Sequence, residues 1–237
     1  MDYQNFPPIP GQQQGMALDN RVSSVMKRVY VKMFLGLIVT ALVSLFCASS
    51  ESVIGFFVQN SWSMWVLIAV ELGLVFAISG AIRRLSSAAA TGLFYLFAVV
   101  NGLMLFPIFF AYSLSAIYKT FFITAGVFGA MSVYGYFTDR DLTKMGSFLF
   151  MALIGLILAS LVNIFVKSSQ FDWIISIIGV LIFVGLTAWD TQQVKQMAQY
   201  SPEEMTGKLA TIGALSLYLD FINLFLYLLR IFGGNRD

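Results

Sequence analysis

Residues 146–166 read GSFLFMALIGLILASLVNIFV, an uninterrupted stretch without a single charged side chain. A helix rises about 1.5 Å per residue, so roughly 20 apolar residues are enough to cross about 30 Å of hydrocarbon. The stretch does not show the alternating units of about 10 residues that are typical of a membrane barrel. It therefore predicts a membrane-spanning helix.

Stretches of similar length and character flank it on both sides. The expected spans are residues 29–50, 62–82, 88–112, 116–137, 146–166, 173–194 and 209–232. Hydrophobic residues make up 59% of the chain and charged residues only 11%, against roughly 25% charged residues in an average soluble domain. We therefore expect an all-α membrane protein with a seven-helix bundle over residues 21–237. Residues 1–20, rich in Pro, Gln and Gly, are expected to form a flexible polar tail.

Two local patterns refine this expectation. Pro107 lies inside the third span and is expected to kink it near one interface, because proline disrupts helix hydrogen bonding. Small residues four positions apart, Gly73 with Ala77 and Ala125 with Gly129, are typical of helices that approach each other closely in membranes. These two pairs are expected to mark helix contacts.

The composition also excludes several classes of function. The chain has no histidine, which rules out a histidine-ligated zinc site, a Ser-His-Asp triad and a histidine proton shuttle. Its single cysteine, Cys47, cannot form an internal disulfide. A net charge of +2 without a long basic run does not suggest nucleic-acid binding. We expect neither an enzyme nor a cofactor, and no nucleic-acid partner.

Basic residues predict the orientation in the membrane. Ten of them fall on the side of the N-terminus: Arg21, Lys27, Arg28, Lys32, Arg83, Arg84, Arg140, Lys144, Lys195 and Lys208. Four fall on the other side: Lys119, Lys167, Arg230 and Arg236. Because cytoplasmic loops are enriched in Lys and Arg, the N-terminus is expected in the cytoplasm and, with seven spans, the C-terminus outside.

Three acidic residues fall within the expected spans and are the most informative charges in the chain. Glu71 lies near the middle of the second span, Asp220 about eleven residues into the seventh, and Asp190 near the inner end of the sixth. An ionised aspartate at the centre of a span costs about 3 kcal/mol on insertion scales, so such residues often mark functional pathways.

Asp190 and Asp220 lie on antiparallel neighbouring spans. With the expected boundaries, their depths differ by about 10 Å at 1.5 Å per residue. They meet if the sixth span continues past residue 194 or if the seventh begins later than residue 209. The sequence leaves this open.

If the two carboxyl groups meet, they are expected to share a proton, because two carboxylates in a low-dielectric site do not both ionise readily. Fully deprotonated, their oxygens suit a hard cation such as Ca²⁺, and Asn223 on the same helix face could add a carbonyl oxygen. The alternative is structural pairing, for example of Asp190 with Arg83 or Arg84. Glu71 could belong to the same interior or make a separate structural contact.

Three stretches resemble the Bax inhibitor-one family, the transmembrane Bax inhibitor motif proteins. They are LSLYLDFINLFLYLLRIFG (residues 215–233), FVGLTAWDTQQVKQM (183–197) and FGAMSVYGYFTDRDLTKMGSFLFMALIGLILASLVN (128–163). The third is similar to bacterial inner-membrane members of that family. The resemblance extends over nearly the whole chain from about residue 21.

The resemblance implies seven helices, with the last one surrounded by the other six. It implies a pH-sensitive calcium leak channel in which Asp190 and Asp220 form the sensor, Glu71 matches a family glutamate, and an arginine near Arg83 and Arg84 latches the aspartates. Calcium would be the transported ion, and a multi-pass location in the bacterial inner membrane is implied. Other relatives are associated with a membrane-bound AAA protease or with suppression of cell death. A regulatory protein that binds another membrane protein is therefore the alternative to a channel.

Overall fold

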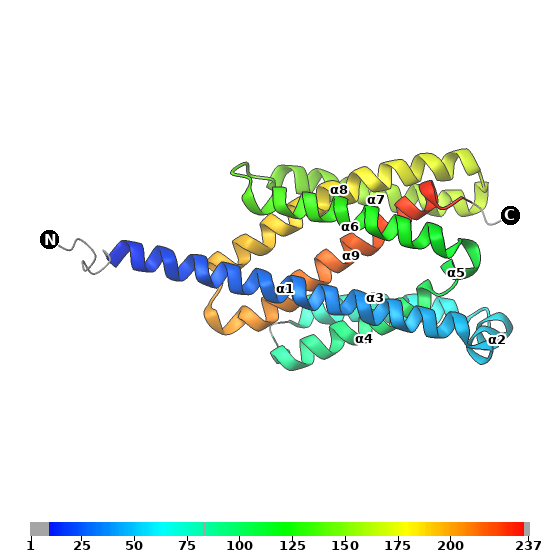
Figure 1. Cartoon of the computed structure of the whole chain (residues 1–237), viewed down its shortest axis with the longest axis horizontal. Coiled ribbons are helices and arrows are strands. Elements are labelled where there is room, and N and C mark those ends of the chain that lie inside the picture. The colour runs from blue at the N-terminus through cyan, green and yellow to red at the C-terminus, as the bar shows by residue number, and fades with distance from the viewer. Residues whose placement is uncertain (1–9, 83, 235–237) are drawn as a thin grey trace.

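The computed structural model describes residues 10–82 and 84–234, and these form a bundle of long helices (Figure 1). The α-helices are α1 (Pro10–Ser49), α2 (Glu51–Gln59), α3 (Ser63–Ala81), α4 (Ser87–Leu105), α5 (Ile108–Ala111), α6 (Leu114–Phe137), α7 (Thr143–Val166), α8 (Ser169–Tyr200) and α9 (Thr206–Phe232). A short 3₁₀ turn covers Glu203–Met205. Within the described residues, seven helical stretches are long and apolar enough to span a membrane, which confirms the predicted all-α class and the number of spans.

Helix boundaries follow local sequence signals. The hydroxyls of Ser86, Ser113 and Ser168 accept hydrogen bonds from the first turns of α4, α6 and α8, the usual role of a serine cap. Helix α4 ends at Leu105, and the short helix α5 begins at Ile108, directly after Pro107. The predicted break in the third span therefore occurs where proline removes a backbone donor.

Helix α1 is longer than expected, since it begins at Pro10, whereas the first span was expected to begin at residue 29. Half of the segment expected to be a tail is therefore helical. Residues 1–9 of that segment lie outside the described residues. The start of α1 and the end of α9 lie at opposite ends of the bundle (Figure 1), as an odd number of spans requires.

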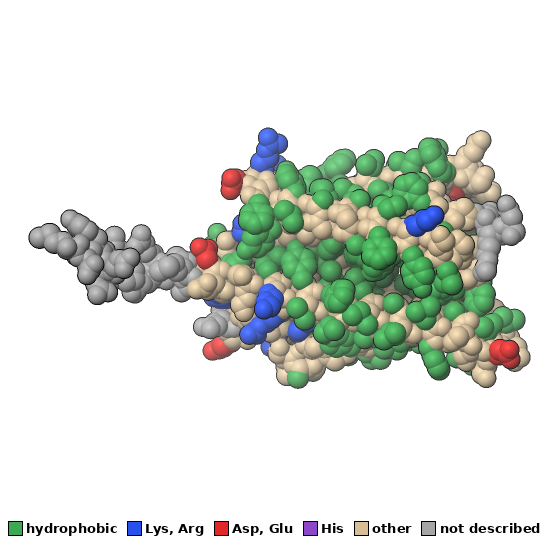
Figure 2. Space-filling model, viewed as in Figure 1, with side chains coloured by type: hydrophobic (Ala, Val, Ile, Leu, Met, Phe, Trp, Pro, Cys, Tyr) green, Lys and Arg blue, Asp and Glu red, His purple; other side chains and the backbone are tan. Residues whose placement is uncertain are grey.

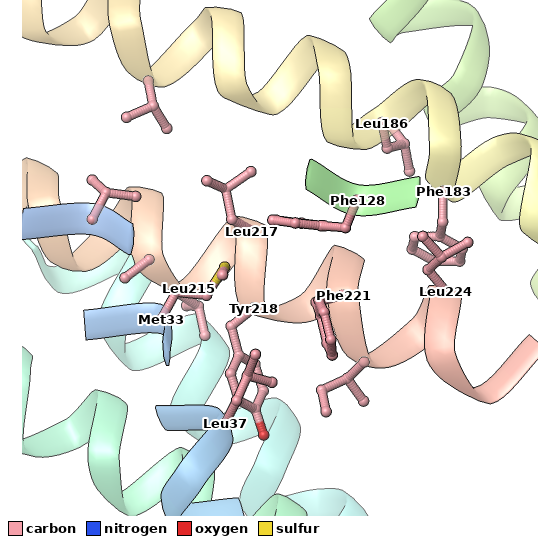
Figure 3. Close-up of a cluster of buried hydrophobic side chains, with 14 of the residues drawn as sticks. Met33, Leu37, Phe128, Phe183, Leu186, Leu215, Leu217, Tyr218, Phe221 and Leu224 are labelled. Carbon is pink, nitrogen blue, oxygen red and sulfur yellow. The ribbon is translucent and has the colours of Figure 1, made fainter. Parts of the chain in front are cut away.

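Helix α9 forms the centre of the bundle. Two thirds of its most apolar window is buried, more than for any other span in the described chain. Figure 3 shows Leu217 of α9 beside Phe128 of α6, and Tyr218 beside Leu37 of α1. Helix α9 makes its main contacts with α1, α4, α6 and α8, whereas α3 packs chiefly against α4 and α7 against α8. The last helix is therefore central, as predicted, with α3 and α7 lying farther from it than the other four spans.

The side of the bundle is apolar. Figure 2 shows hydrophobic side chains along this side and most of the visible Lys and Arg side chains near the end at which α1 begins. Trp62, Trp65 and Trp173 are more than half exposed, as expected for aromatic residues at a membrane interface.

Helices α6 and α8 approach each other closely at a glycine that the small-residue pattern did not select. A Cβ atom on Gly135 of α6 would come within 2.1 Å of the Ala188 carbonyl oxygen of α8. In contrast, a Cβ atom on Gly73 or Gly129 would meet no atom within 4 Å. The expected contacts at the Gly73 and Gly129 pairs are therefore wrong, because small residues with this spacing also occur where a helix faces lipid or a groove.

Candidate functional site

Asp190 and Asp220 come together between α8 and α9. Helix α8 continues to Tyr200, past the polar residues at which the sixth span was expected to end, and residues 201–205 join it to α9. The difference in depth between the two acids is then about four residues, or about 6 Å. Their carboxyl groups lie within hydrogen-bonding reach of each other. Of the possibilities that the sequence left open, the extension of the sixth span is the one that occurs.

The α9 side of this pair is buried from solvent. Asp220 is only 4% exposed and its Oδ2 atom has no hydrogen-bond partner among the described residues, while Asp190 is half-buried. An ionised carboxylate only accepts hydrogen bonds, so a bond between two carboxyl groups requires a proton on one of them. A hydrogen bond between them would therefore hold one shared proton, and the loss of that proton would place two like charges side by side.

The pair by itself does not form a complete calcium site. Two carboxylates supply at most four oxygens, whereas Ca²⁺ takes six to eight. The described part of the chain holds no group of three or more acidic, cysteine or histidine side chains that could bind a metal. Backbone carbonyls or water would have to provide the remaining ligands of an ion in passage.

The other residues expected near the pair lie elsewhere or bond elsewhere. The Asn223 side chain donates to the Leu219 carbonyl oxygen of its own helix at 2.8 Å. Arg84 follows α3 and is exposed, and no ion pair of Arg84 is found among the described residues. Arg83 lies outside the described residues. The expected contact of an arginine with the two aspartates therefore remains a prediction.

Glu71 belongs to a second polar centre, on another side of α9. The Asn101 amide of α4 is hydrogen-bonded to Glu71 Oε1, and Asn101 Oδ1 lies 3.0 Å from the Tyr218 hydroxyl of α9. The Tyr218 hydroxyl in turn lies 2.6 Å from the Thr40 hydroxyl of α1, which is 2.9 Å from the Ala98 carbonyl oxygen. Of the two possibilities considered for Glu71, the structure places it in a contact separate from the aspartate pair.

Lys32 forms a polar contact that the sequence did not reveal. Its ammonium group donates to the hydroxyls of Thr91 and Thr211, both at 2.7 Å, and lies 3.4 Å from the Gly207 carbonyl oxygen. This cation therefore joins α1, α4 and α9 near the end of the bundle where α9 begins. In the sequence it is one basic residue among several at that end, and only the tertiary structure brings the two threonines to it.

Gln192, two residues after Asp190, ties α8 to the loop before α7. It accepts from the Leu142 backbone N–H at 2.9 Å and donates to the Arg140 carbonyl oxygen at 2.8 Å. Lys195 donates to the Tyr136 carbonyl oxygen at 2.7 Å. These bonds hold the C-terminal part of α8 in place, which helps to fix the position of Asp190.

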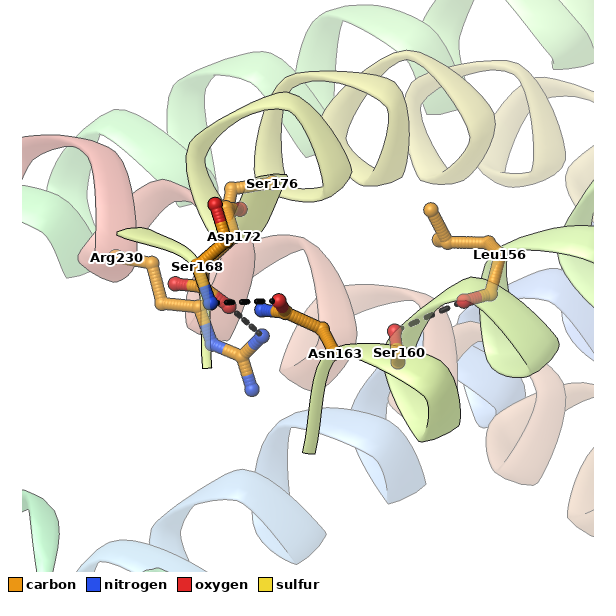
Figure 4. A network of polar contacts seen from close by, with 7 residues as sticks. All are labelled: Leu156, Ser160, Asn163, Ser168, Asp172, Ser176 and Arg230. Atoms are coloured by element: carbon orange, nitrogen blue, oxygen red, sulfur yellow. Dashed lines mark hydrogen bonds and ion pairs between the residues drawn. The ribbon is translucent and has the colours of Figure 1, made fainter. Parts of the chain in front are cut away.

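The opposite end of α8 carries an ion pair with α9. Figure 4 shows Arg230 reaching Asp172, and the two groups lie 3.6 Å apart and are both about half exposed. In the same view the side chain of Asn163 accepts a hydrogen bond from the Ser168 backbone N–H at 3.2 Å. Exposed ion pairs contribute little to stability, so this one mainly orients the two helix ends.

Comparison with known proteins shows the family to which the chain belongs. The family model described as "Inhibitor of apoptosis-promoting Bax1" matches residues 22–237. Inner membrane protein YbhL of Escherichia coli strain K12 is 47% identical over 218 residues, which cover 91% of this chain and 93% of YbhL. A protein of Borreliella burgdorferi is 46% identical, with 89% and 91% of the two chains covered. A membrane protein of Streptococcus pyogenes serotype M3 is 42% identical, with 78% and 80% covered. The chain therefore belongs to the family of inhibitors of apoptosis-promoting Bax1, the Bax inhibitor-1 family.

Proposed function

We propose that the protein is a pH-sensitive leak pathway for calcium across a bacterial inner membrane, with Asp190 and Asp220 as its sensor. The observation that carries this proposal is the close approach of two carboxyl groups on neighbouring helices inside a chain without histidine. Calcium would be the cargo, and the proposal includes no resident cofactor.

The proton shared by the two carboxyl groups is the switching element in this mechanism. While one proton is present, the hydrogen bond holds α8 against α9. When it is lost, the two negative charges repel each other and their oxygens become available to a hard cation. Proton binding and cation passage would therefore compete for the same pair of side chains.

The proposed orientation places the start of α1 in the cytoplasm. The distribution of Lys and Arg toward that end of the bundle supports it. The similarity to an inner membrane protein of E. coli supports the location. The orientation is tested with single cysteines in a Cys47→Ala background, introduced at Ser24 and at Asn60, which lie near opposite ends of the described bundle. Intact cells are treated with a membrane-impermeant thiol reagent. The Asn60 position should react and the Ser24 position should not.

The channel proposal is tested by calcium flux into liposomes that contain the purified protein. Wild-type flux should change with pH. Asp190→Asn and Asp220→Asn should remove that change, because an amide donates a hydrogen bond to the remaining carboxyl group at every pH. Asp172→Asn, on the same helix but in an exposed ion pair, is the matched control and should retain the wild-type profile. No flux at any pH, or one profile shared by all four proteins, would refute the proposal.

A second proposal is that the protein regulates another membrane protein, such as a membrane-bound AAA protease or a stress factor. It is favoured by the description of the matched family, which names an inhibitory action on a protein. Site-specific photocrosslinking from the exposed faces of α3 and α7 in living cells would test it. A specific crosslinked partner would support this function, and its absence at every tested position would count against it.

A further inference from the structure

A chain of hydrogen-bonding groups crosses the half of the bundle that does not contain the aspartate pair. It begins at Glu71 of α3 and passes through Asn101 of α4 and Tyr218 of α9 to Thr40 of α1. It ends at the Ala98 carbonyl oxygen of α4. Asn101, Tyr218 and Thr40 are buried, and Glu71 is half-buried. Four contacts thus join five groups.

The number of protons available to these contacts depends on Glu71. If Glu71 is a carboxylate, the Asn101 amide donates to it and the Tyr218 hydroxyl donates to Asn101 Oδ1. The only proton left for the 2.6 Å contact between Tyr218 and Thr40 is that of Thr40. The contact of Thr40 with the Ala98 carbonyl oxygen, at 2.9 Å, then contains no hydrogen, because each hydroxyl has one proton to donate.

One added proton satisfies all four contacts. The oxygen and nitrogen of an asparagine amide can be exchanged without moving the heavy-atom positions. With the amide reversed, a protonated Glu71 donates to Asn101 oxygen, Asn101 nitrogen donates to Tyr218, Tyr218 donates to Thr40, and Thr40 donates to the Ala98 carbonyl oxygen. Every donor then points in one direction along the chain.

The surroundings offer Glu71 no compensating cation among the described residues. The one ion pair found there joins Arg230 to Asp172 at the far end of α9. Lys32 and Arg28 of α1 lie eight and twelve residues before Thr40, or about 12 and 18 Å along the helix. An uncompensated carboxylate at this depth in a bilayer is costly.

The remaining titratable groups on the packed helices do not supply a charge either. Tyr95 is the other such group on α4, and Cys47 on α1 lies seven residues past Thr40. On α9, Asp220 faces Asp190 of α8, on a different side of the helix from Tyr218. Lys208 and Tyr227 lie ten residues before and nine residues after Tyr218, or about 15 and 14 Å along the helix. The group from a neighbouring element that faces this chain is therefore Tyr218 itself.

We propose that Glu71 is a second proton-binding site, and that its proton sets the direction of the hydrogen-bond chain through Asn101, Tyr218 and Thr40. Loss of the proton reverses the chain and releases Thr40 from the Ala98 carbonyl oxygen, which weakens a contact between α1 and α4. Helix α9 is then held by proton-bearing contacts on two sides, one formed with Glu71 and one with Asp190. This site does not depend on calcium flux, so its test is independent of the proposed channel.

The test is infrared spectroscopy of the full-length protein in lipid nanodiscs at pH 7, which detects the C=O stretch of protonated carboxyl groups. The spectrum of wild type should contain a band that Glu71→Gln removes. Glu51→Gln, at an exposed position of α2, is the matched control and should leave the band unchanged. A Glu71→Gln spectrum with the same bands as wild type would overturn the proposal.

A second protein keeps the test valid if Glu71→Gln does not fold. In the Asp190→Asn/Asp220→Asn double variant, Glu71 is the interior carboxyl group that remains. A protonated carboxyl band should persist at pH 7 in this double variant. Adding Tyr218→Phe to the double variant should shift that band, because the hydrogen-bond chain is interrupted at the tyrosine hydroxyl. Complete loss of protonated carboxyl bands from the double variant would refute a proton on Glu71.

Discussion

Replacing Gly135 with alanine should force α6 and α8 apart and disturb the aspartate pair. The new Cβ atom would lie 2.1 Å from the Ala188 carbonyl oxygen, and ordinary contact begins at 3.4 Å. The helices must therefore separate locally by about 1.3 Å, the difference between these two distances. The obstacle is backbone and not a flexible side chain, so the strain cannot be relieved by a change of rotamer.

The energetic cost can be bounded from known effects. Overpacking a well-packed interior costs about 1–3 kcal/mol, and the better helix propensity of alanine offsets roughly 0.5–1 kcal/mol of that. For a chain of this size, 1 kcal/mol corresponds to roughly 2–4 °C in melting temperature. The net cost is then roughly 0.5–2 kcal/mol, so we expect the melting temperature of Gly135→Ala in detergent to fall by roughly 1–8 °C.

The same substitution has a functional consequence. Ala188 lies two residues before Asp190 in α8, so a shift of this segment should disturb the contact with Asp220. In the liposome assay, the pH profile of calcium flux should change as well. Gly126→Ala, in the same helix but with no atom within 4 Å of the new Cβ, should preserve both the melting temperature and the profile. If the two variants behave alike, the close approach of α6 and α8 is refuted.

Three further substitutions test other contacts through the melting temperature in detergent. Gln192→Ala leaves the buried Leu142 N–H without its partner and should cost about 1–3 kcal/mol, whereas the exposed Gln193→Ala should change nothing measurable. Lys32→Met should change the free energy of unfolding by less than about 1 kcal/mol, because both threonines that Lys32 contacts also donate to carbonyl oxygens of their own helices. A larger loss would show that the ammonium group is essential for stability. Hydrogen bonds from the side chain and backbone of the first residue of α7 hold the pKa of Asp141 below its ordinary value. The stability that these hydrogen bonds contribute is therefore present above the ordinary pKa of aspartate and is lost as the pH falls through the lowered pKa. The Asp141→Asn protein should consequently lose less melting temperature than wild type at acidic pH. An equal loss in both proteins would contradict this.

The number of spans and the class of the fold could be predicted from the sequence because both depend on hydropathy along the chain. A run such as residues 146–166 must lie in lipid wherever its neighbours are. The three interior acids could be identified for the same reason, since a charge within such a run is conspicuous without any knowledge of packing. The resemblance to a known family added the expectation that Asp190 and Asp220 meet.

The contacts between helices depended on the tertiary structure. The polar residues after 194 look the same in a sequence whether they form a loop or continue a helix into water, and only the structure shows α8 reaching Tyr200. Small residues gave a misleading signal at Gly73 and none at Gly135, because spacing along one helix does not show which face meets another helix. The partners of Glu71 and Lys32 come from helices far away in the sequence. Hydropathy determines which segments enter the membrane, whereas helix rotation and depth determine which side chains touch, and those are properties of the whole bundle.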